Sequence, residues 1–273
     1  MPAKHTLKMT LLMSLLVCSL LACDVLPSVS FNGTPVTPLQ QAGGSASLDV
    51  WTTTQPGVDI RREQWKGASG NTDTVTITRF DPTKVKISIG YQPGNPQPLK
   101  TWMKQTKAIA VINGGFFDEQ DVATALIISN GQTYGASYQG CCGMFSVDNQ
   151  GQVAIQSLAA QPYDPNTQQL EQATQCRPVL IINGKRTQFQ ETAESSPRSI
   201  IAMDTQGRLL FIVSPSAAFS LDETADLLQQ SDLQLKTALN LDGGSSTGLY
   251  FNSGNQQVSL DPVSPLPIVI IVK

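Results

Sequence analysis

Residues 238–248 read Ala-Leu-Asn-Leu-Asp-Gly-Gly-Ser-Ser-Thr-Gly, an apolar run that ends at a carboxylate and two glycines. Gly243 and Gly244 lack a Cβ atom, so they can adopt positive φ and allow a ligand to approach the backbone closely. The hydroxyls of Ser245 and Ser246 stand beside exposed N–H groups, and such a turn suits an oxyanion or a phosphate. The alternative is a tight turn between two strands in which Asp242 binds its own backbone.

The first 22 residues have the features of a secretory signal. Lys4 and Lys8 precede an apolar run at 9–21, which is short for a membrane-spanning helix. The run ends in Leu-Leu-Ala-Cys, which resembles a bacterial lipobox and implies cleavage before Cys23 followed by lipidation. We therefore expect residues 1–22 to be a lipoprotein signal peptide, and the exported protein to be anchored to a membrane of the cell envelope through Cys23. The alternative is an ordinary signal peptide that ends near a cysteine.

Cleavage at this position removes the only histidine, His5. The chain has 18 basic and 21 acidic residues, and the loss of Lys4 and Lys8 reduces the number of basic residues by two. The net charge therefore falls from −3 to −5. This balance argues against nucleic-acid binding, which requires a basic face. Without histidine, a Ser-His-Asp triad, a Cys-His pair and imidazole metal ligands are excluded, so acid–base chemistry must use Asp, Glu, Tyr, Lys or Cys.

Three of the five cysteines remain once Cys18 and the lipidated Cys23 are set aside. An odd number allows at most one internal disulfide, and we expect it to join Cys176 to Cys141 or Cys142. A bond between the neighbours Cys141 and Cys142 is the alternative. Three thiols without histidine lack the spacing of a zinc site, so no metal site is predicted.

The mature chain divides into a tether and one domain. Residues 23–49 are rich in Pro, Gly, Ser, Thr and Gln and poor in charge, which is typical of a flexible tether. Residues 50–273 are enough for a single domain with a substantial core. Strand signals outnumber helix signals, and hairpin turns separate many of them. We expect an α+β fold with mainly antiparallel or mixed β-sheet and a few flanking helices.

Two helices and a series of strands are predicted. Pro98 begins a short helix that runs to Lys107, and Ser220 with Glu223 forms a capping box for a second helix that ends near Ser231. Alternating or continuous apolar runs predict strands at 74–78, 85–91, 109–112, 125–129, 143–147, 153–156, 179–182, 199–203, 209–213, 247–251 and 268–272.

Two further segments carry residues suited to a binding site. The segment Asn-Gly-Gly-Phe-Phe-Asp follows a buried strand; its Gly114 and Gly115 free the backbone, while Asn113 and Asp118 add polar groups. The alternative is a strand-to-loop turn with both phenylalanines in the core. Arg198 stands at the entry to a strand, where it can bind a phosphodiester through two N–H groups. The alternative there is a surface ion pair.

Three segments together resemble the phosphodiester glycosidase family. They are Ile-Asn-Gly-Gly-Phe-Phe at 112–117, Pro-Arg-Ser-Ile-Ile-Ala at 197–202 and Asn-Leu-Asp-Gly-Gly-Ser-Ser-Thr at 240–247, in the order seen in that family. The chain departs from many members at Ser245, where they carry a third glycine. The resemblance implies hydrolysis of the bond between the anomeric carbon of a sugar and a phosphodiester oxygen.

The resemblance and the residue chemistry together suggest roles for the site. Asp242 is the expected base or nucleophile, and Asp118 is either the second carboxylate or positions a sugar hydroxyl, with Asn113 as a further catalytic residue. The separation of the two carboxyl groups would distinguish a retaining from an inverting route. The residues expected to contact the phosphate and the rest of the substrate are Arg198, Gly114, Gly115, Gly243, Gly244, Ser245 and Ser246. No cofactor is required, although Asp118, Asp121 and Asp242 offer oxygen ligands to Ca²⁺ or Mg²⁺.

The expected function is a hydrolase that cleaves the glycosidic bond of a sugar-1-phosphodiester in the cell envelope, with a sugar phosphate or glycopolymer as ligand. The alternative is a non-catalytic envelope lipoprotein that binds glycans or anionic glycopolymers through the same glycines and arginine. The hydrolase requires Asn113, Arg198 and Asp242 to meet around one cleft.

Overall fold

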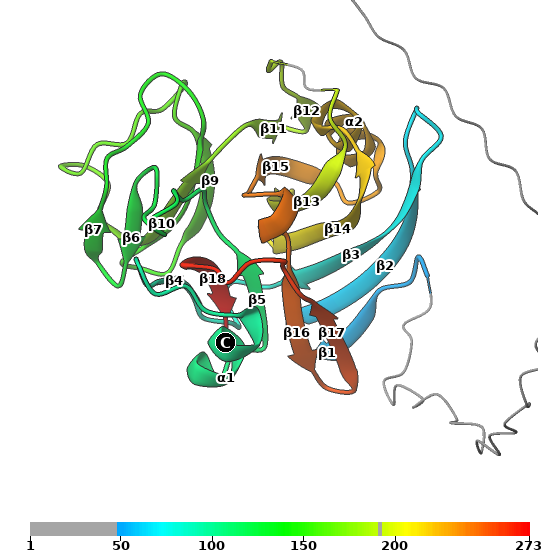
Figure 1. The fold of residues 1–273 in the computed structure, drawn as a ribbon, viewed down its shortest axis with the longest axis horizontal. Helices are drawn as coiled ribbons and strands as arrows, with labels where there is room; N and C mark the ends of the chain where they lie inside the picture. Colours follow the sequence, from blue (N-terminus) through cyan, green and yellow to red (C-terminus); the bar gives the residue numbers. More distant parts are fainter. Residues whose placement is uncertain (1–47, 191–192) are drawn as a thin grey trace, which may run out of the picture. The chain divides into compact units, whose positions relative to one another are not determined.

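Three β-sheets form the fold, and every pairing between their strands is antiparallel (Figure 1). The computed structural model describes residues 48–190 and 193–273. The predicted signal peptide at 1–22, the lipidation site Cys23 and most of the tether at 23–49 lie outside the described residues. Within the described part, none of the helices has the length and hydropathy needed to cross a bilayer.

The largest sheet has eight strands in the order β1 (Thr52–Gln55), β2 (Val58–Lys66), β3 (Thr72–Phe80), β14 (Leu209–Phe219), β13 (Ser196–Asp204), β15 (Leu235–Asn240), β11 (Val179–Ile182) and β12 (Lys185–Arg186). A five-stranded sheet has the order β7 (Gln132–Tyr134), β6 (Ile127–Ser129), β10 (Leu170–Cys176), β8 (Gly143–Asp148) and β9 (Val153–Ser157). A second five-stranded sheet has the order β17 (Gln256–Leu260), β16 (Leu249–Ser253), β5 (Ala110–Asn113), β18 (Ile268–Val272) and β4 (Ile87–Tyr91).

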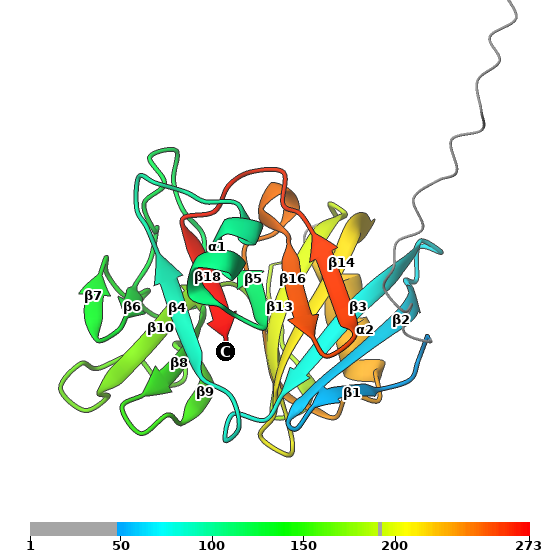
Figure 2. The ribbon, with the colours of Figure 1, turned by 90° about the horizontal axis from the view of Figure 1, so that it is seen from below.

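Two α-helices cover outer faces of these sheets (Figure 2). Helix α1 (Leu99–Thr106) follows Pro98 and packs Leu99 and Trp102 onto β5 and β18. Helix α2 (Leu221–Gln230) packs on the eight-stranded sheet and begins at the predicted capping box, in which the side chains of Ser220 and Glu223 each accept from the other's backbone N–H. A single 3₁₀ turn, η1 (Gly244–Ser246), follows β15.

The central core joins all three sheets. Its fully buried members include Ile60 on β2 and Phe211 on β14 from the large sheet, Phe145 on β8, and Ile89 and Phe251 from β4 and β16. Because strand residues alternate between faces, the large sheet contributes a second apolar set to the cluster beneath α2. The three sheets therefore share one interior and form a single α+β domain, which confirms the predicted fold class.

Two connections between sheets meet at one place. Residues 241–248 lead from β15 to β16, and Arg177 and Pro178 lead from β10 to β11. The last residue of β15, Asn240, links the two connections: it donates from its backbone N–H to Pro178 O at 3.0 Å and from its side chain to Arg177 O at 2.9 Å. This junction of the three sheets carries the candidate site.

Candidate active site

Asp242 lies on the loop between β15 and β16, and hydrogen bonds from the end of β5 fix this loop. Asn113 donates from Nδ2 to the Asp242 carbonyl oxygen at 2.6 Å, and its Oδ1 accepts from the Gly248 N–H at 3.2 Å. The Asp242 N–H donates to Gly114 O at 3.1 Å. Because Asn113 is buried, one side-chain amide holds both ends of the loop in place.

The Asp242 carboxyl group is half-buried, and burial raises its pKa above the ordinary value of 3.8. Two hydrogen bonds favour the charged form and so act to lower the pKa of Asp242. One comes from the Ser246 side chain, and the other from the Gly243 N–H, which donates to Oδ1 at 3.0 Å. Asp242 forms no ion pair with any described residue. A carboxylate in this state binds a proton more readily than an exposed one, which suits a general base.

Arg198, near the start of β13, is the second charged group at this place. Its side chain is buried, its Nη2 donates to the Glu194 carbonyl oxygen at 2.9 Å, and its Nε has no partner among the described residues. No ion pair within the described residues neutralises it; burial lowers its pKa, and the charge of the nearby Glu194 acts in the opposite direction. Arginine nevertheless stays charged in proteins. A buried guanidinium without a carboxylate partner is a favourable site for an anion.

Gly243 and Gly244 bring the Asp242 loop close to Arg198. A Cβ atom on Gly243 would stand 3.1 Å from Pro197 O and 3.8 Å from Arg198 Nη1, so only glycine fits comfortably between the two segments. Gly244 has φ of +59°, which glycine adopts without strain. The two residues thus place backbone next to the guanidinium.

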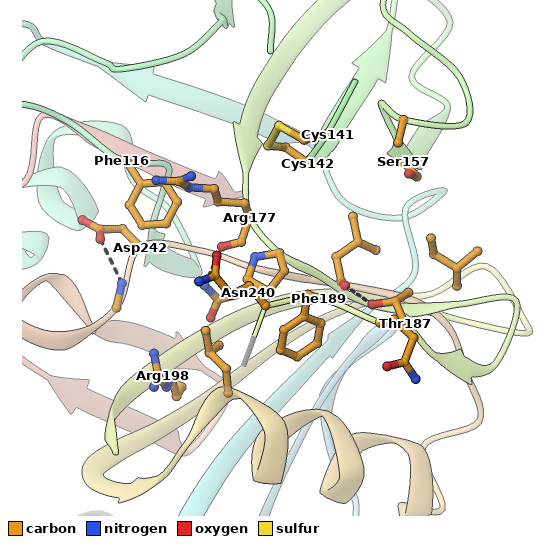
Figure 3. Close-up of a pocket in the computed structure, with 18 of the residues that line it drawn as sticks. Phe116, Cys141, Cys142, Ser157, Arg177, Thr187, Phe189, Arg198, Asn240 and Asp242 are labelled. Atoms are coloured by element: carbon orange, nitrogen blue, oxygen red, sulfur yellow. Dashed lines mark hydrogen bonds between the residues drawn. A yellow bond between two sulfur atoms is a disulfide. The ribbon is translucent and has the colours of Figure 1, made fainter. Parts of the chain in front are cut away.

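These groups open into a cavity of about 820 Å³. Figure 3 shows Phe116, Asp242 and Arg198 at the left of the cavity, Asn240 and Arg177 in the middle, and Ser157 and Thr187 towards the right. The full lining consists of Phe116, Cys141, Cys142, Ser157, Ala159, Arg177, Pro178, Val179, Ile182, Thr187, Gln188, Phe189, Gln190, Ser196, Arg198, Leu221, Asn240, Asp242, Gly243 and Gly244.

Asn240 and Arg177 are site residues that the sequence analysis missed. The Asn240 side chain is buried, and its Oδ1 has no partner among the described residues although the residue lines the cavity. A signal for it was present, because residues two apart at the end of a strand share a face and Asn240 precedes Asp242 by two. Arg177 is an exposed residue that adds a second positive charge to the wall.

Several predicted site residues do not line the cavity. Asp118 is exposed, and its Oδ1 accepts from the N–H groups of Gln120 and Val122, so this carboxylate caps its own loop and is not brought to Asp242. The other predicted site residues outside the lining are Asn113, Gly114, Gly115, Ser245 and Ser246. Asn113 and Ser246 support Asp242, and Ser245 is exposed. Gly114 and Gly115 pack tightly against Ile268 and Gln175.

The predicted disulfide between Cys176 and Cys141 or Cys142 is wrong. The structure joins the neighbours Cys141 and Cys142, and Cys176 is a buried free thiol. The topology places Cys176, at the end of β10, opposite Gly143 and thus near Cys142, but the Cys176 side chain is buried in the core, whereas Cys141 and Cys142 line the cavity. Burial, followed by the neighbouring Asp242, raises the pKa of the Cys176 thiol well above its usual range.

The acidic side chains do not gather into a metal centre. Within 48–190 and 193–273, no group of three or more His, Cys, Asp or Glu residues is placed to hold an ion. Asp118, Asp121 and Asp242, which offer oxygen ligands, are not brought together as such a group.

Comparisons with known proteins agree with this arrangement. The sequence profile of the phosphodiester glycosidase family matches residues 106–273, which include Asn113, Arg198 and Asp242. The chain belongs to the phosphodiester glycosidase family. No curated protein matches the sequence.

Solved structures share the fold of this phosphodiester glycosidase domain. The catalytic domain of zebrafish N-acetylglucosamine-1-phosphodiester alpha-N-acetylglucosaminidase, auto-inhibited by its pro-peptide, superposes with a TM-score of 0.62 and 19% identity over 85% of this chain and 86% of that chain. A hypothetical protein from Synechocystis superposes with a TM-score of 0.59 and 19% identity over 81% of this chain. This chain covers 63% of the Synechocystis protein. Similarity at such identity shows the fold alone.

Proposed function

We propose that this protein hydrolyses the glycosidic bond of a sugar-1-phosphodiester, with Asp242 as general base and Arg198 as the phosphate ligand. The observation that carries the proposal is a half-buried carboxylate of raised pKa on the wall of the same cavity as a buried guanidinium that forms no ion pair with the described residues. Two opposite charges that face a cavity without neutralising each other are arranged for a ligand rather than for stability.

In the proposed reaction, the phosphodiester binds at Arg198 and the backbone of Gly243 and Gly244. Asp242 accepts a proton from a water molecule, whose oxygen forms the new bond to the anomeric carbon. The bond between this carbon and the phosphate oxygen breaks, and its electron pair leaves on the phosphate. The product is a free sugar and a phosphate monoester, whose additional charge Arg198 stabilises.

One acidic residue stands among the described residues that line the cavity, and this agrees with the proposed chemistry. That residue is Asp242. A two-carboxylate glycosidase uses its second carboxyl group to protonate a basic leaving group. A phosphate monoester is a weak base, so it leaves without strong general-acid assistance, and a cationic group fulfils the remaining requirement.

The test compares two aspartates of the same chain. The substrate is a chromogenic N-acetylglucosamine 1-phosphodiester, and release of the chromophore is measured for the wild type, Asp242→Asn and Asp118→Asn. We expect Asp242→Asn to lose at least roughly 100-fold in kcat, as is typical when a general base is removed. Asp118→Asn keeps an acceptor for the N–H groups of its loop and should retain wild-type kcat.

Two outcomes would refute this proposal. Wild-type turnover by a folded Asp242→Asn protein would exclude the base. Binding of the ester without turnover, equal in the wild type and Asp242→Asn, would instead support the non-catalytic glycan-binding lipoprotein.

We also propose that the hydrolase acts in the cell envelope, anchored through a lipid on Cys23. Support comes from the sequence at residues 1–23, whose apolar run and lipobox-like end are typical of lipoproteins. Labelling of cells with an alkyne fatty acid should tag the wild-type protein and leave Cys23→Ala unlabelled. Equal labelling of both proteins would exclude this anchor.

A further inference from the structure

We propose that the group on the far side of the substrate's phosphate is a hydrocarbon chain, bound in an apolar arm of the cavity. The apolar arm is the part of the lining formed by Ala159, Pro178, Val179, Ile182, Phe189 and Leu221. The inference rests on the proposed function, because it assigns the second substituent of the phosphodiester whose sugar side faces Asp242.

The charges of the cavity are segregated at one end. Among the described residues of the lining, the charged ones are Arg177, Arg198 and Asp242. Arg198 stands against Gly243, and the Arg177 carbonyl accepts from Asn240, so all three belong to the junction around the Asp242 loop. The other described residues of the lining carry no charged side chain. A second phosphate or a charged polymer unit would lose its hydration there without gaining a partner.

The walls of the apolar arm are fixed by both adjoining cores. Val179 and Ile182 lie on β11 and pack with the central core, while Phe189 and Leu221 pack with the cluster beneath α2. The apolar side chains are therefore held in position before a ligand arrives, which lowers the entropic cost of binding.

Two polar groups next to the apolar arm, those of Arg186 and Thr187, are already paired. The guanidinium of Arg186 lies 5.4 Å from the centroid of the Phe189 ring and pairs with Asp222 and, at 2.9 Å, with Asp226. The Thr187 hydroxyl donates to the Val179 carbonyl (Figure 3). Ser157, Gln188 and Gln190 also line the cavity, but the six side chains of the apolar arm offer a polar aglycone no hydrogen-bond partner, whereas a hydrocarbon chain needs none.

The size of the cavity favours an occupant beyond the sugar. Small-molecule pockets span roughly 300–1,000 Å³, and a cavity of about 820 Å³ lies in the upper part of that range. The polar end, with Asp242, Asn240 and Arg198, suits the sugar and the phosphate. The apolar arm remains for an alkyl, acyl or isoprenoid chain.

The experiment measures the affinity of methyl, butyl and octyl phosphate for the full chain by isothermal titration calorimetry. Each methylene that enters the arm should strengthen binding roughly threefold to fourfold, which corresponds to the usual gain for burying a CH₂ group. In parallel, turnover is measured with the methyl and octyl phosphodiesters of N-acetylglucosamine, and KM should fall by a similar factor for each added methylene that enters the arm.

A variant that fills the arm supplies the specific test. Ala159→Trp places a large side chain at an exposed lining position and should reduce the affinity for octyl phosphate to that for methyl phosphate. Ala68→Trp introduces the same side chain at an exposed position outside the lining and should keep the wild-type chain-length series.

The outcomes separate this inference from the proposed function. Hydrolysis of the methyl ester with no dependence on chain length overturns the apolar arm and leaves the hydrolase in place. Chain-length-dependent binding without hydrolysis of either ester overturns the hydrolase and with it the assignment of the chain as an aglycone. Tighter binding of glycerol phosphate than of octyl phosphate would show a polar occupant and overturn the inference.

Discussion

Removal of the Asn113 side chain should weaken both the fold and the site, because one amide holds the Asp242 loop. In Asn113→Ala, the buried Gly248 N–H and the Asp242 carbonyl lose partners at 3.2 and 2.6 Å. Each buried group left unpaired costs roughly 1–3 kcal/mol, and water can reach the half-buried Asp242. We therefore expect a loss of about 2–4 kcal/mol in the free energy of unfolding.

The measurement is urea unfolding followed by far-UV circular dichroism. With a typical slope of about 2 kcal/mol per molar urea, the midpoint should fall by roughly 1–2 M while the slope stays constant. Asn252→Ala is the matched control, since Asn252 is exposed on β16 and should keep the wild-type midpoint. An Asn113→Ala protein with an unchanged midpoint would refute the reasoning, because the loop would then be held by its remaining contacts alone.

Three other predictions follow from the same geometry. The value of kcat/KM should rise with pH as Asp242 loses its proton, with a midpoint above 3.8. Because the raised pKa means that the charged form of Asp242 is disfavoured in the folded state, Asp242→Asn should have a higher Tm than the wild type at pH 7. This difference in Tm should disappear in acid, where Asp242 is protonated. Gly244→Ala should cost about 1 kcal/mol in urea unfolding because of its φ of +59°, and an unchanged midpoint would contradict this. Iodoacetamide should leave Cys176 unlabelled in the folded protein and label Cys141 and Cys142 only after reduction, as read by mass spectrometry.

The elements with strong local signals could be predicted from the sequence. Helix α2 begins at its capping box, and the apolar runs at 199–203 and 209–213 lie within β13 and β14, because these strands are buried on both faces. Strand β10 was missed, since it buries Gln172 and Gln175. Gln172 accepts from the backbone of β4, and Gln175 is bonded to the segment before the disulfide, so tertiary partners replace the hydrophobic pattern.

The candidate site was partly predictable for a similar reason. The Asp242 loop and Arg198 were identified because glycine pairs and strand-entry arginines can be recognised locally, and the structure brings them together. Asp118 could not be assigned from sequence alone, because a carboxylate that caps its own loop and one that faces a ligand follow a glycine pair equally well. The disulfide could not be assigned from the sequence, because the pairing depends on whether β10 buries the side chain of Cys176.

The position of the site where three sheets meet has a consequence for how this protein responds to ligands. Neither the Asp242 loop nor the Arg177–Pro178 connection can keep its geometry unless the sheets on both sides are intact. A compound that binds in the cavity should therefore stabilise the entire domain against unfolding. Amide hydrogen exchange should slow in strands far from the pocket, and a fragment that lacks any one sheet should neither bind nor turn over the ester.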